Sequence, residues 1–335
     1  MNLITGATGL LGTHIALRLL QQGERVRAIR RDGSDLSHIH EIFRYYSPEK
    51  DYFNQIEWVE GDVLDIPSIL DAMDGCRMVY HTAAIVSYHK ADRKNMYRVN
   101  LEGTSNIVNC ALEAGVEKLC HVSSVAALGK AKSNGIISEQ TEWVDAESNT
   151  HYGITKHESE MEVYRGIEEG LNAIIVNPGF IIGPGDFSRS SASLFKKLNE
   201  GMTYYPPGGT GFVSAGDCAD AIIKLMSKPV ESTNYIVVAE NLSMKEIFSE
   251  VSKSLGKKPP HKEAGKIILE LARLAEWLKE TITGKKALVT KETIKNASIM
   301  ACYDNQKLKN TIDFNPEKIS ASIALTADYF KKMSL

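Results

Sequence analysis

The chain has 335 residues, 43% of them hydrophobic, and carries 39 Lys and Arg against 42 Asp and Glu, a formal net charge of −3. This length and composition predict a globular protein of about two domains. The balanced charge gives no reason to expect nucleic acid or an anionic membrane as a partner, and no run of about 20 uncharged apolar residues predicts a transmembrane helix.

The cysteines predict reduced thiols. Their number is odd and no two are closely spaced, which indicates neither a disulfide framework nor a zinc site; they are Cys76, Cys110, Cys120, Cys218 and Cys302. We therefore expect a cytoplasmic protein, without a signal peptide, because the first strand begins almost at residue 1. His38 and His40 stand beside Glu41 without metal-ligand spacing, so no metal is expected.

The first predicted strand, Leu3–Thr5, runs into a glycine-rich turn and the helix Thr13–Gln22. The spacing G-x-x-G-x-x-G differs from the simpler G-x-G-x-x-G fingerprint, but strand, turn and helix together indicate dinucleotide binding. Gly6 permits the tight turn, Gly9 lets the backbone approach a pyrophosphate, and Gly12 lets the helix pack on the strand. N–H groups at the helix start hold the phosphates. The predicted cofactor contacts of this loop are Gly6, Thr8, Gly9, Leu10, Leu11 and Gly12.

Strands and helices then alternate. Further strands are predicted at Arg25–Ile29, Ile56–Glu60, Arg77–Ala84, Lys118–Ser123 and Asn172–Asn177, and helices at Tyr97–Ala114 and Tyr152–Glu169. This alternation predicts an α/β fold with a Rossmann-type, doubly wound parallel sheet and the cofactor across the carboxyl ends of its strands.

The regular alternation of strands and helices ends after Gly185. Helices are predicted at Ser191–Asn199, Cys218–Met226 and Met244–Ser254. We expect residues 1–177 to form the nucleotide-binding domain and residues 178–335 mainly a smaller α+β substrate domain. Residues 212–214 and 235–238 are segments that can return to the main sheet.

The end of the second strand distinguishes the two nicotinamide cofactors. An NAD site usually has Asp or Glu there, whereas an NADP site uses Arg for the 2′-phosphate. This chain has Arg30 and Arg31, followed by Asp32. Because a guanidinium matches phosphate geometry, we predict NADP, with NAD as the less favoured cofactor. Two solvent-exposed arginines at a strand end are the simpler alternative.

The predicted catalytic pair is Tyr152 and Lys156. Residues four apart share a helix face, and a Lys ammonium near a Tyr hydroxyl lowers the Tyr pKa toward working pH, so that the Tyr can act as general acid or base. The same spacing occurs at two other places that are less favoured. Tyr46/Lys50 contains Pro48, which disfavours a regular helix, and Tyr303/Lys307 lies far in the sequence from the nucleotide fold.

Two hydroxyls precede the catalytic pair at the end of a strand. Ser124 is the residue that we expect to hold a substrate carbonyl near Tyr152, with Ser123 as a packing or cofactor-side hydroxyl. The alternative is that both serines cap the strand end.

These motifs together resemble the extended short-chain dehydrogenase/reductase family, in its dihydroflavonol-4-reductase-like and NAD-dependent epimerase/dehydratase branch. The resemblance covers most of the chain. It implies a catalytic Ser124, Tyr152 and Lys156, with Asn100 completing the hydrogen-bond chain of the active site. It also implies cofactor contacts from three further segments, Gly61-Asp62-Val63, His81-Thr82-Ala83-Ala84 and the loop Asn177-Pro178-Gly179-Phe180; these contacts are Asp62, Val63, Thr82, Ala83, Ala84, Pro178 and Phe180, together with Tyr152 and Lys156.

Three functions remain open. The first is an NADP-dependent reductase of a small-molecule carbonyl. The second is a nucleotide-sugar epimerase or dehydratase that retains its cofactor, against which Arg30 and Arg31 speak because that branch mostly uses NAD. The third is a non-catalytic NADP sensor, against which the intact triad speaks. In the plant flavonoid enzymes an Asn follows the catalytic Ser at the place that Gly129 holds here, so dihydroflavonol specificity is not expected.

Two further expectations concern contacts. The resemblance implies a homodimer that pairs the helices Tyr97–Ala114 and Tyr152–Glu169, with Ile107, Val108 and Leu112 as apolar candidates that can equally face the sheet. The amphipathic run Lys266–Ile282 is expected to be a packed helix of the smaller domain, with covering the cleft, contacting a partner or touching a membrane surface as alternatives.

Overall fold

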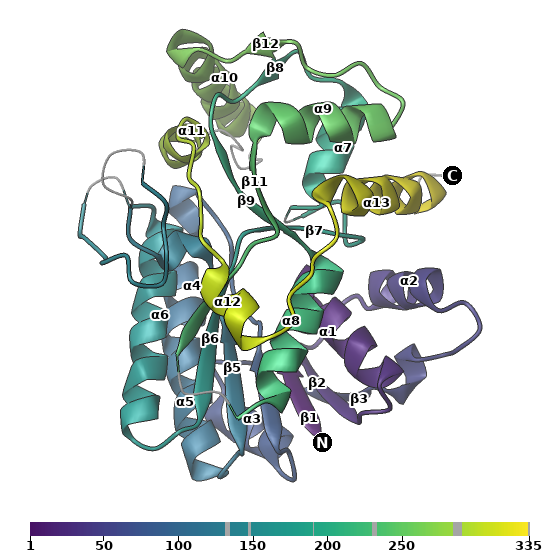
Figure 1. Ribbon diagram of the computed structural model, residues 1–335, viewed down its shortest axis with the longest axis vertical. Helices are drawn as coiled ribbons and strands as arrows, with labels where there is room; N and C mark the ends of the chain where they lie inside the picture. Colours follow the sequence, from purple (N-terminus) through teal and green to yellow (C-terminus); the bar gives the residue numbers. More distant parts are fainter. Residues whose placement is uncertain (131–134, 147–148, 190, 230–232, 284–289, 334–335) are drawn as a thin grey trace.

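The computed structural model describes residues 1–130, 135–146, 149–189, 191–229, 233–283 and 290–333. A layered α/β part lies at the bottom of Figure 1, and a smaller cap of helices and short strands lies above it. None of the helices within these ranges is long and apolar enough to span a membrane.

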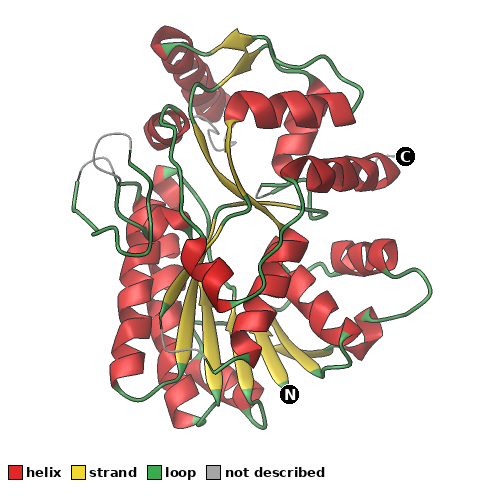
Figure 2. Ribbon diagram, in the orientation of Figure 1, coloured by secondary structure: helices red, strands yellow, loops and turns green. Residues whose placement is uncertain are grey.

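A parallel sheet forms the centre of the larger part (Figure 2). The strands are β1 (Asn2–Thr5), β2 (Val26–Arg30), β3 (Glu57–Glu60), β4 (Met78–His81), β5 (Lys118–Val122), β6 (Ala173–Pro178) and β10 (Asn234–Val237). Their order is β10-β6-β5-β4-β1-β2-β3, and every neighbouring pair is parallel. This order confirms the predicted fold class, and it places the switch point at which dinucleotides bind between β1 and β4.

Helices cover both faces of this sheet, and successive strand residues supply the two cores. Ile4 packs into the core that contains α1 and α8, whereas its neighbour Leu3 packs into the core that contains α3, α5 and α6, as expected when side chains alternate across a strand. The helices and helical turns of this part are α1 (Leu10–Gln21), α2 (Ser37–Tyr46), η1 (Phe53–Gln55), α3 (Ile66–Met73), η2 (Lys90–Asp92), α4 (Arg93–Tyr97), η3 (Arg98–Glu102), α5 (Gly103–Glu113), η4 (Val125–Ala127), α6 (His151–Glu168) and α8 (Ala215–Ser227).

The helix predicted over Tyr97–Ala114 is not one regular helix. A π-helical turn, η3, separates α4 from α5 and contains the buried Asn100. Such wider turns often occur at functional sites, and the simple helical period of the sequence could not predict one. Ile107 and Val108 on α5 are fully buried in the core beneath α6, so they do not form the dimer surface for which they were candidates.

The cap contains its own core between helices and a small sheet. In this sheet β9 (Gly209–Ser214) lies between β11 (Glu240–Ser243) and β7 (Phe180–Ile182), so residues 212–214 do not return to the main sheet, whereas β10 does. A two-stranded ladder joins β8 (Tyr204–Tyr205) to β12 (Lys262–Glu263). The helices of the cap are α7 (Ser193–Glu200), α9 (Met244–Ser254), α10 (Lys266–Thr283), α11 (Lys291–Ala297) and α13 (Ile319–Met333), and α12 (Gln306–Thr311) lies beside β10.

Helix α10 forms over the amphipathic run that predicted it, but its orientation is unexpected. Most of its large apolar side chains, among them Ile267, Leu271 and Trp277, are exposed, while Ile268 and Leu269 are half-buried. The expectation of a helix packed by its apolar face is therefore wrong, because the hydrophobic period of a helix does not say which face the rest of the chain covers.

Candidate active site

The glycine turn after β1 is fixed by close backbone approaches. Gly6 has a φ of 71°, and a Cβ there would lie 2.6 Å from the backbone nitrogen of Ala83. A Cβ at Gly12 would overlap the Gly6 carbonyl oxygen and lie 2.8 Å from the Ala7 Cα. Gly9 is different, because a Cβ there would meet only the Gly6 carbonyl oxygen, at 3.2 Å. Gly6 and Gly12 thus bring β1, β4 and α1 together.

This turn begins α1 without a side-chain cap on its first N–H groups, so these donors are arranged to receive an anion. They open into a cavity of about 880 Å³ that continues under the cap. The predicted site residues that line it are Gly6, Gly9, Leu10, Leu11, Gly12, Thr82, Ala84, Ser124, Tyr152, Lys156, Pro178 and Phe180. Residues from five separate segments of the sequence therefore meet in one cavity at the carboxyl ends of the strands.

Tyr152 and Ser124 meet because two tight turns place them side by side. Thr150 caps α6 by accepting a hydrogen bond of 3.0 Å from the Gly153 nitrogen. A Cβ at Gly153 would lie 2.6 Å from the Ala126 carbonyl oxygen, so glycine lets α6 approach the η4 turn. The Ser124 hydroxyl accepts a 3.1 Å hydrogen bond from the Ala126 nitrogen, and a side-chain hydrogen bond links it to Tyr152. Ser124 therefore serves both as a cap and as a neighbour of Tyr152.

The pKa of Tyr152 is raised, not lowered as the Tyr/Lys spacing predicted. Burial is the main cause, and the hydrogen bond from Ser124 opposes it only in part. The hydrogen bonds of Lys156 go to partners other than Tyr152. Its Nζ donates to the Val122 carbonyl at 2.9 Å and to His121 Nε2 at 3.3 Å. The Tyr152 hydroxyl consequently keeps its proton to a higher pH than an ordinary tyrosine.

Lys156 is itself a perturbed group. It is 1% exposed, and burial lowers its pKa from 10.5 to about 8. Its neighbour His121 is held neutral, because burial and the Lys156 charge hold the pKa of His121 well below 6.5. A neutral imidazole nitrogen can accept the hydrogen bond from the Lys156 ammonium.

Sequence reasoning missed the carboxyl group that completes this cluster. Glu160 lies one helical turn after Lys156 and is 3% exposed. The Asn177 amide donates a 2.6 Å hydrogen bond to its Oε1. Burial raises the pKa of Glu160 to about 7, while Ser123, Asn177 and Lys156 act in the opposite direction. The i,i+4 spacing from Lys156 was the signal that could have found it.

Asn100 is fully buried beside α6, and its side-chain hydrogen bonds go to Ile85 and Thr155 instead of Tyr152 or Lys156. Its Oδ1 accepts from the Ile85 nitrogen at 2.7 Å, and its Nδ2 donates to the Thr155 hydroxyl at 3.0 Å. Thr155 in turn donates to the Tyr152 carbonyl at 2.9 Å. These bonds connect the π-helical turn to the first turn of α6, behind the cavity.

Six of the predicted cofactor contacts lie outside the lining of the main cavity. Thr8 lines a smaller adjoining cavity, and Ala83 lies behind the glycine turn. The Asp62 carboxylate accepts a hydrogen bond from the Leu64 nitrogen at 2.9 Å, which is the role of a turn cap. Val63 is buried next to α5. Arg30 is half-buried at the end of β2, and a sixth residue outside the lining, Arg31, is exposed immediately after it.

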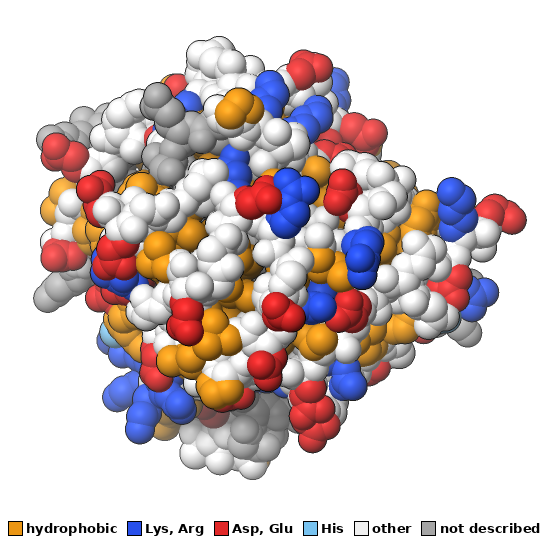
Figure 3. All heavy atoms as spheres, turned by 90° about the horizontal axis from the view of Figure 1, so that it is seen from below, with side chains coloured by type: hydrophobic (Ala, Val, Ile, Leu, Met, Phe, Trp, Pro, Cys, Tyr) orange, Lys and Arg blue, Asp and Glu red, His pale blue; other side chains and the backbone are white. Residues whose placement is uncertain are grey.

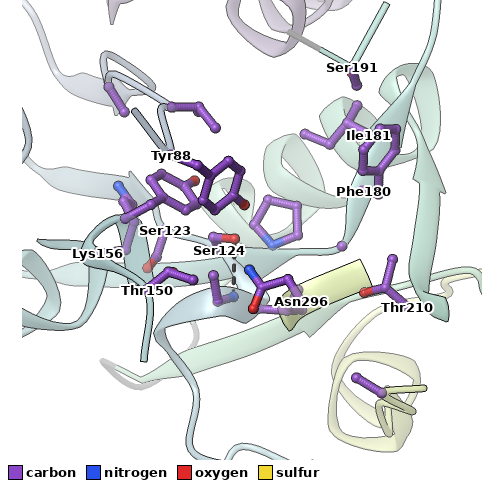
Figure 4. Close-up of a pocket in the computed structure, with 18 of the residues that line it drawn as sticks. Tyr88, Ser123, Ser124, Thr150, Lys156, Phe180, Ile181, Ser191, Thr210 and Asn296 are labelled. Atoms are coloured by element: carbon purple, nitrogen blue, oxygen red, sulfur yellow. Dashed lines mark hydrogen bonds between the residues drawn. The ribbon is translucent and has the colours of Figure 1, made fainter. Parts of the chain in front are cut away.

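The far side of the cavity is built from side chains that the sequence did not indicate (Figure 4). The Tyr88 ring lies 6.1 Å from the Tyr152 ring in an edge-on arrangement, and the Tyr88 hydroxyl is hydrogen-bonded to the Asn296 side chain. Tyr303 is hydrogen-bonded in the same way to Thr210. Phe180 and Ile181 lie across the cavity from Tyr88. Aromatic and apolar side chains with these hydrogen-bonded polar groups thus line the space beside Tyr152, and Asp92, Lys130 and Lys197 also line the cavity.

The chain is similar to known proteins along almost its whole length. The NAD dependent epimerase/dehydratase family matches residues 2–239. The sterol demethylase protein B of Methylococcus capsulatus is 33% identical over 77% of this chain and 75% of its own. A putative dihydroflavonol 4-reductase of Synechocystis is 27% identical over 98% of this chain and 94% of its own. The crystal structure of gox2253 is 29% identical and superposes with a TM-score of 0.82 over 99% of this chain and 98% of its own. These matches confirm the resemblance drawn from the motifs.

Proposed function

Because the chain belongs to the NAD dependent epimerase/dehydratase family, we propose that this NAD(P)-dependent oxidoreductase reduces a small-molecule carbonyl with NADPH, and that Tyr152 is the general acid. One observation carries the proposal: a buried, protonated tyrosine, hydrogen-bonded to Ser124, faces the cavity that begins at the glycine turn. A raised pKa suits a proton donor, because the hydroxyl retains its proton until the reaction demands it.

The residues present fit a dinucleotide. The uncapped start of α1 offers N–H groups to a pyrophosphate, and Gly9 leaves the approach open. When bound, the nicotinamide supplies the hydride that a carbonyl carbon accepts. Pro178 and Phe180 lie where they would cover it, at the boundary between the proposed nucleotide-binding residues 1–177 and the proposed substrate-binding residues 178–335.

Each residue of the triad has a role that its surroundings support. The Ser124 hydroxyl orients the carbonyl oxygen, and Tyr152 Oη donates its proton to that oxygen. The positive charge of Lys156 stabilises the phenolate that Tyr152 leaves behind, and its Nζ is available to ribose hydroxyls. Asn100 acts at a distance, because its bonds to Ile85 and Thr155 position the first turn of α6.

Arg30 and Arg31 support NADPH over NADH, since guanidinium groups at the end of β2 suit a 2′-phosphate.

The walls of the cavity support a carbonyl compound with an apolar body. The described lining contains no arginine, the side chain that binds a diphosphate through paired hydrogen bonds, which favours a carbonyl compound over a nucleotide sugar, although Lys130 and Lys197 also line the cavity. The names of the relatives suggest testing flavanonols and sterol ketones along with simple aldehydes and ketones.

The proposal also includes a cytoplasmic location, supported by five cysteines that are all free, and a homodimer. Met161 on α6 is 44% exposed and is an apolar side chain available for the helix pairing of such a dimer.

The test is the substitution Tyr152→Phe, which removes the proton donor and keeps the ring. Turnover of accepted carbonyls should fall roughly 100- to 10,000-fold, measured as NADPH oxidation, while NADPH affinity, measured by titration, should persist. Tyr164→Phe on the same helix is the matched control, because Tyr164 packs into the core behind α6 and should retain full activity. If Tyr152→Phe matches the wild type within a few-fold, Tyr152 is not the acid.

If no carbonyl is reduced while NADPH still binds tightly, the epimerase and sensor functions become the better explanations. A nucleotide sugar altered without net consumption of NADPH would then support the epimerase.

A further inference from the structure

Helix α10 is amphipathic, but its apolar face points toward solvent and its polar face toward the rest of the protein. The exposed side chains at i, i+4, i+7, i+11 and i+15 form one stripe; they are Ile267 (78% exposed), Leu271, Leu274, Leu278 and Ile282 (74% exposed). Trp277, 58% exposed, lies beside this stripe. An ordinary surface helix buries such a stripe against the core.

The inner face of α10 carries charge instead. Glu280, 30% exposed, pairs with His89 at 2.7 Å. Glu276, 21% exposed, is close enough to Lys197 that its charge opposes the lowering of the Lys197 pKa by burial. His89 and Lys197 both line the cavity. Polar contacts therefore hold α10 beside the cavity, and its apolar stripe is left facing outward.

The sequence segment that contains α10 is rich in lysine. Residues 253–295 contain eleven Lys and Arg against five Asp and Glu, in a chain whose net charge is −3. Lys257, Lys258, Lys262 and Lys266, which precede or begin the helix, are all exposed. On the face at the opposite end of the molecule, positive and negative side chains are interspersed (Figure 3). The balanced total charge of the chain thus hides one basic region.

We propose that the outer face of α10 docks this protein on a membrane surface that contains anionic lipids. An exposed apolar stripe with a tryptophan and flanking lysines is the composition of a helix that lies in the plane of such a surface. Each basic residue near an anionic surface adds to the attraction.

A second copy of the chain suits this face less well. In a symmetric dimer the same patch meets itself, so two α10 helices in contact would bring two basic segments together. A neutral or acidic protein partner would need one groove that accepts both the tryptophan and the stripe of five aliphatic side chains. Nothing in this chain indicates such a partner. Crossing the bilayer does not suit it either, because Lys266, Glu270, Arg273, Glu276, Lys279 and Glu280 all belong to α10.

Docking through α10 would place the cavity near the lipid. Because Glu280 pairs with His89 and Glu276 acts electrostatically on Lys197, both of them residues of the cavity wall, the part of the cavity beside α10 would face the membrane, where an apolar carbonyl compound would concentrate. The docking itself does not depend on the proposed reaction, since binding to vesicles requires neither cofactor nor turnover.

The test is co-sedimentation of the full chain with phosphatidylcholine vesicles that contain about one third phosphatidylglycerol. The wild type should bind these vesicles, bind pure phosphatidylcholine weakly, and dissociate when salt is raised from about 0.1 to about 1 M. Leu274→Glu with Leu278→Glu should lower the bound fraction roughly tenfold or more, because it places two carboxylates in the stripe. Leu325→Glu on α13, at a position 39% exposed, is the matched control and should bind as the wild type does.

The NADPH affinity and thermal unfolding of each variant show that it is folded, and light scattering gives its mass in solution. Wild-type protein that stays in the supernatant overturns the proposal, as does a double variant that binds as tightly as the wild type. If the wild type ignores vesicles and the double substitution halves the mass in solution, a second copy covers α10 and the membrane proposal is wrong. Loss of reductase activity in Tyr152→Phe leaves all of these outcomes unchanged.

Discussion

The two walls of the cavity are built in different ways. On the nucleotide side, backbone atoms define the surface, and a Cβ at Gly6 or Gly12 would collide with neighbouring main chain. On the cap side, side chains define it through neutral hydrogen bonds, such as those of Tyr88 with Asn296 and of Tyr303 with Thr210. A side chain at Gly6 or Gly12 would disturb the packing of strands, whereas replacing one of these hydrogen-bonding side chains changes the shape and polarity of the surface. Under the proposed function, the chemistry would rest on the rigid wall and the choice of substrate on the adjustable one.

The largest expected effect sharpens the nucleotide side. Replacing both Arg30 and Arg31 with Ala should weaken NADPH binding roughly 100- to 10,000-fold, because each charge-assisted bond to the 2′-phosphate contributes about 1.5–3 kcal/mol. NADH affinity should change little, since NADH lacks that phosphate. Titration of both cofactors into wild type and variant measures the difference.

Arg25→Ala is the control for this pair, because Arg25 is exposed just before β2, at the opposite end of the strand. It should bind both cofactors as the wild type does. Equal wild-type affinities for NADH and NADPH would contradict the NADP assignment.

A smaller effect concerns the buried charges behind the rigid wall. The Lys156 pKa of about 8 predicts that activity declines as pH rises through this value, because the ammonium loses its proton while Tyr152, with its raised pKa, keeps its own. Glu160, with a pKa of about 7, is charged in this range and favours the charged form of Lys156. Glu160→Gln should therefore move the alkaline decline to lower pH, by roughly one unit.

The pH profile of kcat measures this shift. Glu162→Gln is the matched control, since Glu162 lies on the same helix but pairs with Arg165 away from the cavity, and its profile should superpose on that of the wild type. An alkaline decline that stays in place in Glu160→Gln would mean that Lys156 does not set it.

The same division explains what the sequence predicted. The glycine turn, the parallel strands and the Tyr152–Lys156 helix have local signals, because glycine spacing, apolar runs and i,i+4 pairs are fixed by backbone geometry. Lys156 and Ser124, which these signals singled out, both line the cavity. Tyr88, Thr210 and the pair Asn296 and Tyr303 come from three distant segments, and no local sequence pattern predicts that they meet. The prediction that the Tyr152 pKa is lowered was wrong for a related reason. The spacing places Lys156 on the same helix face as Tyr152, but the burial of Tyr152 and the hydrogen-bond partners of Lys156 Nζ depend on the tertiary structure.

The smallest expected effect tests the adjustable wall. Asn296→Ala removes one neutral hydrogen bond, to the Tyr88 hydroxyl, and such a bond contributes about 0.5–1.5 kcal/mol. Because Asn296 lies on α11 of the cap and lines the cavity there, we expect KM for the carbonyl substrate to change roughly 2- to 10-fold, while kcat and NADPH affinity remain as in the wild type. Steady-state kinetics against several carbonyls measures this, with Asn310→Ala on α12, an exposed position, as the control. The sign of the change should depend on the substrate, since a larger space favours bulkier compounds and an unpaired Tyr88 hydroxyl favours polar ones. A uniform loss of kcat for every substrate would instead show that Tyr88 and Asn296 support Tyr152 itself. The division of the cavity into a catalytic wall and a substrate-selecting wall would then be wrong.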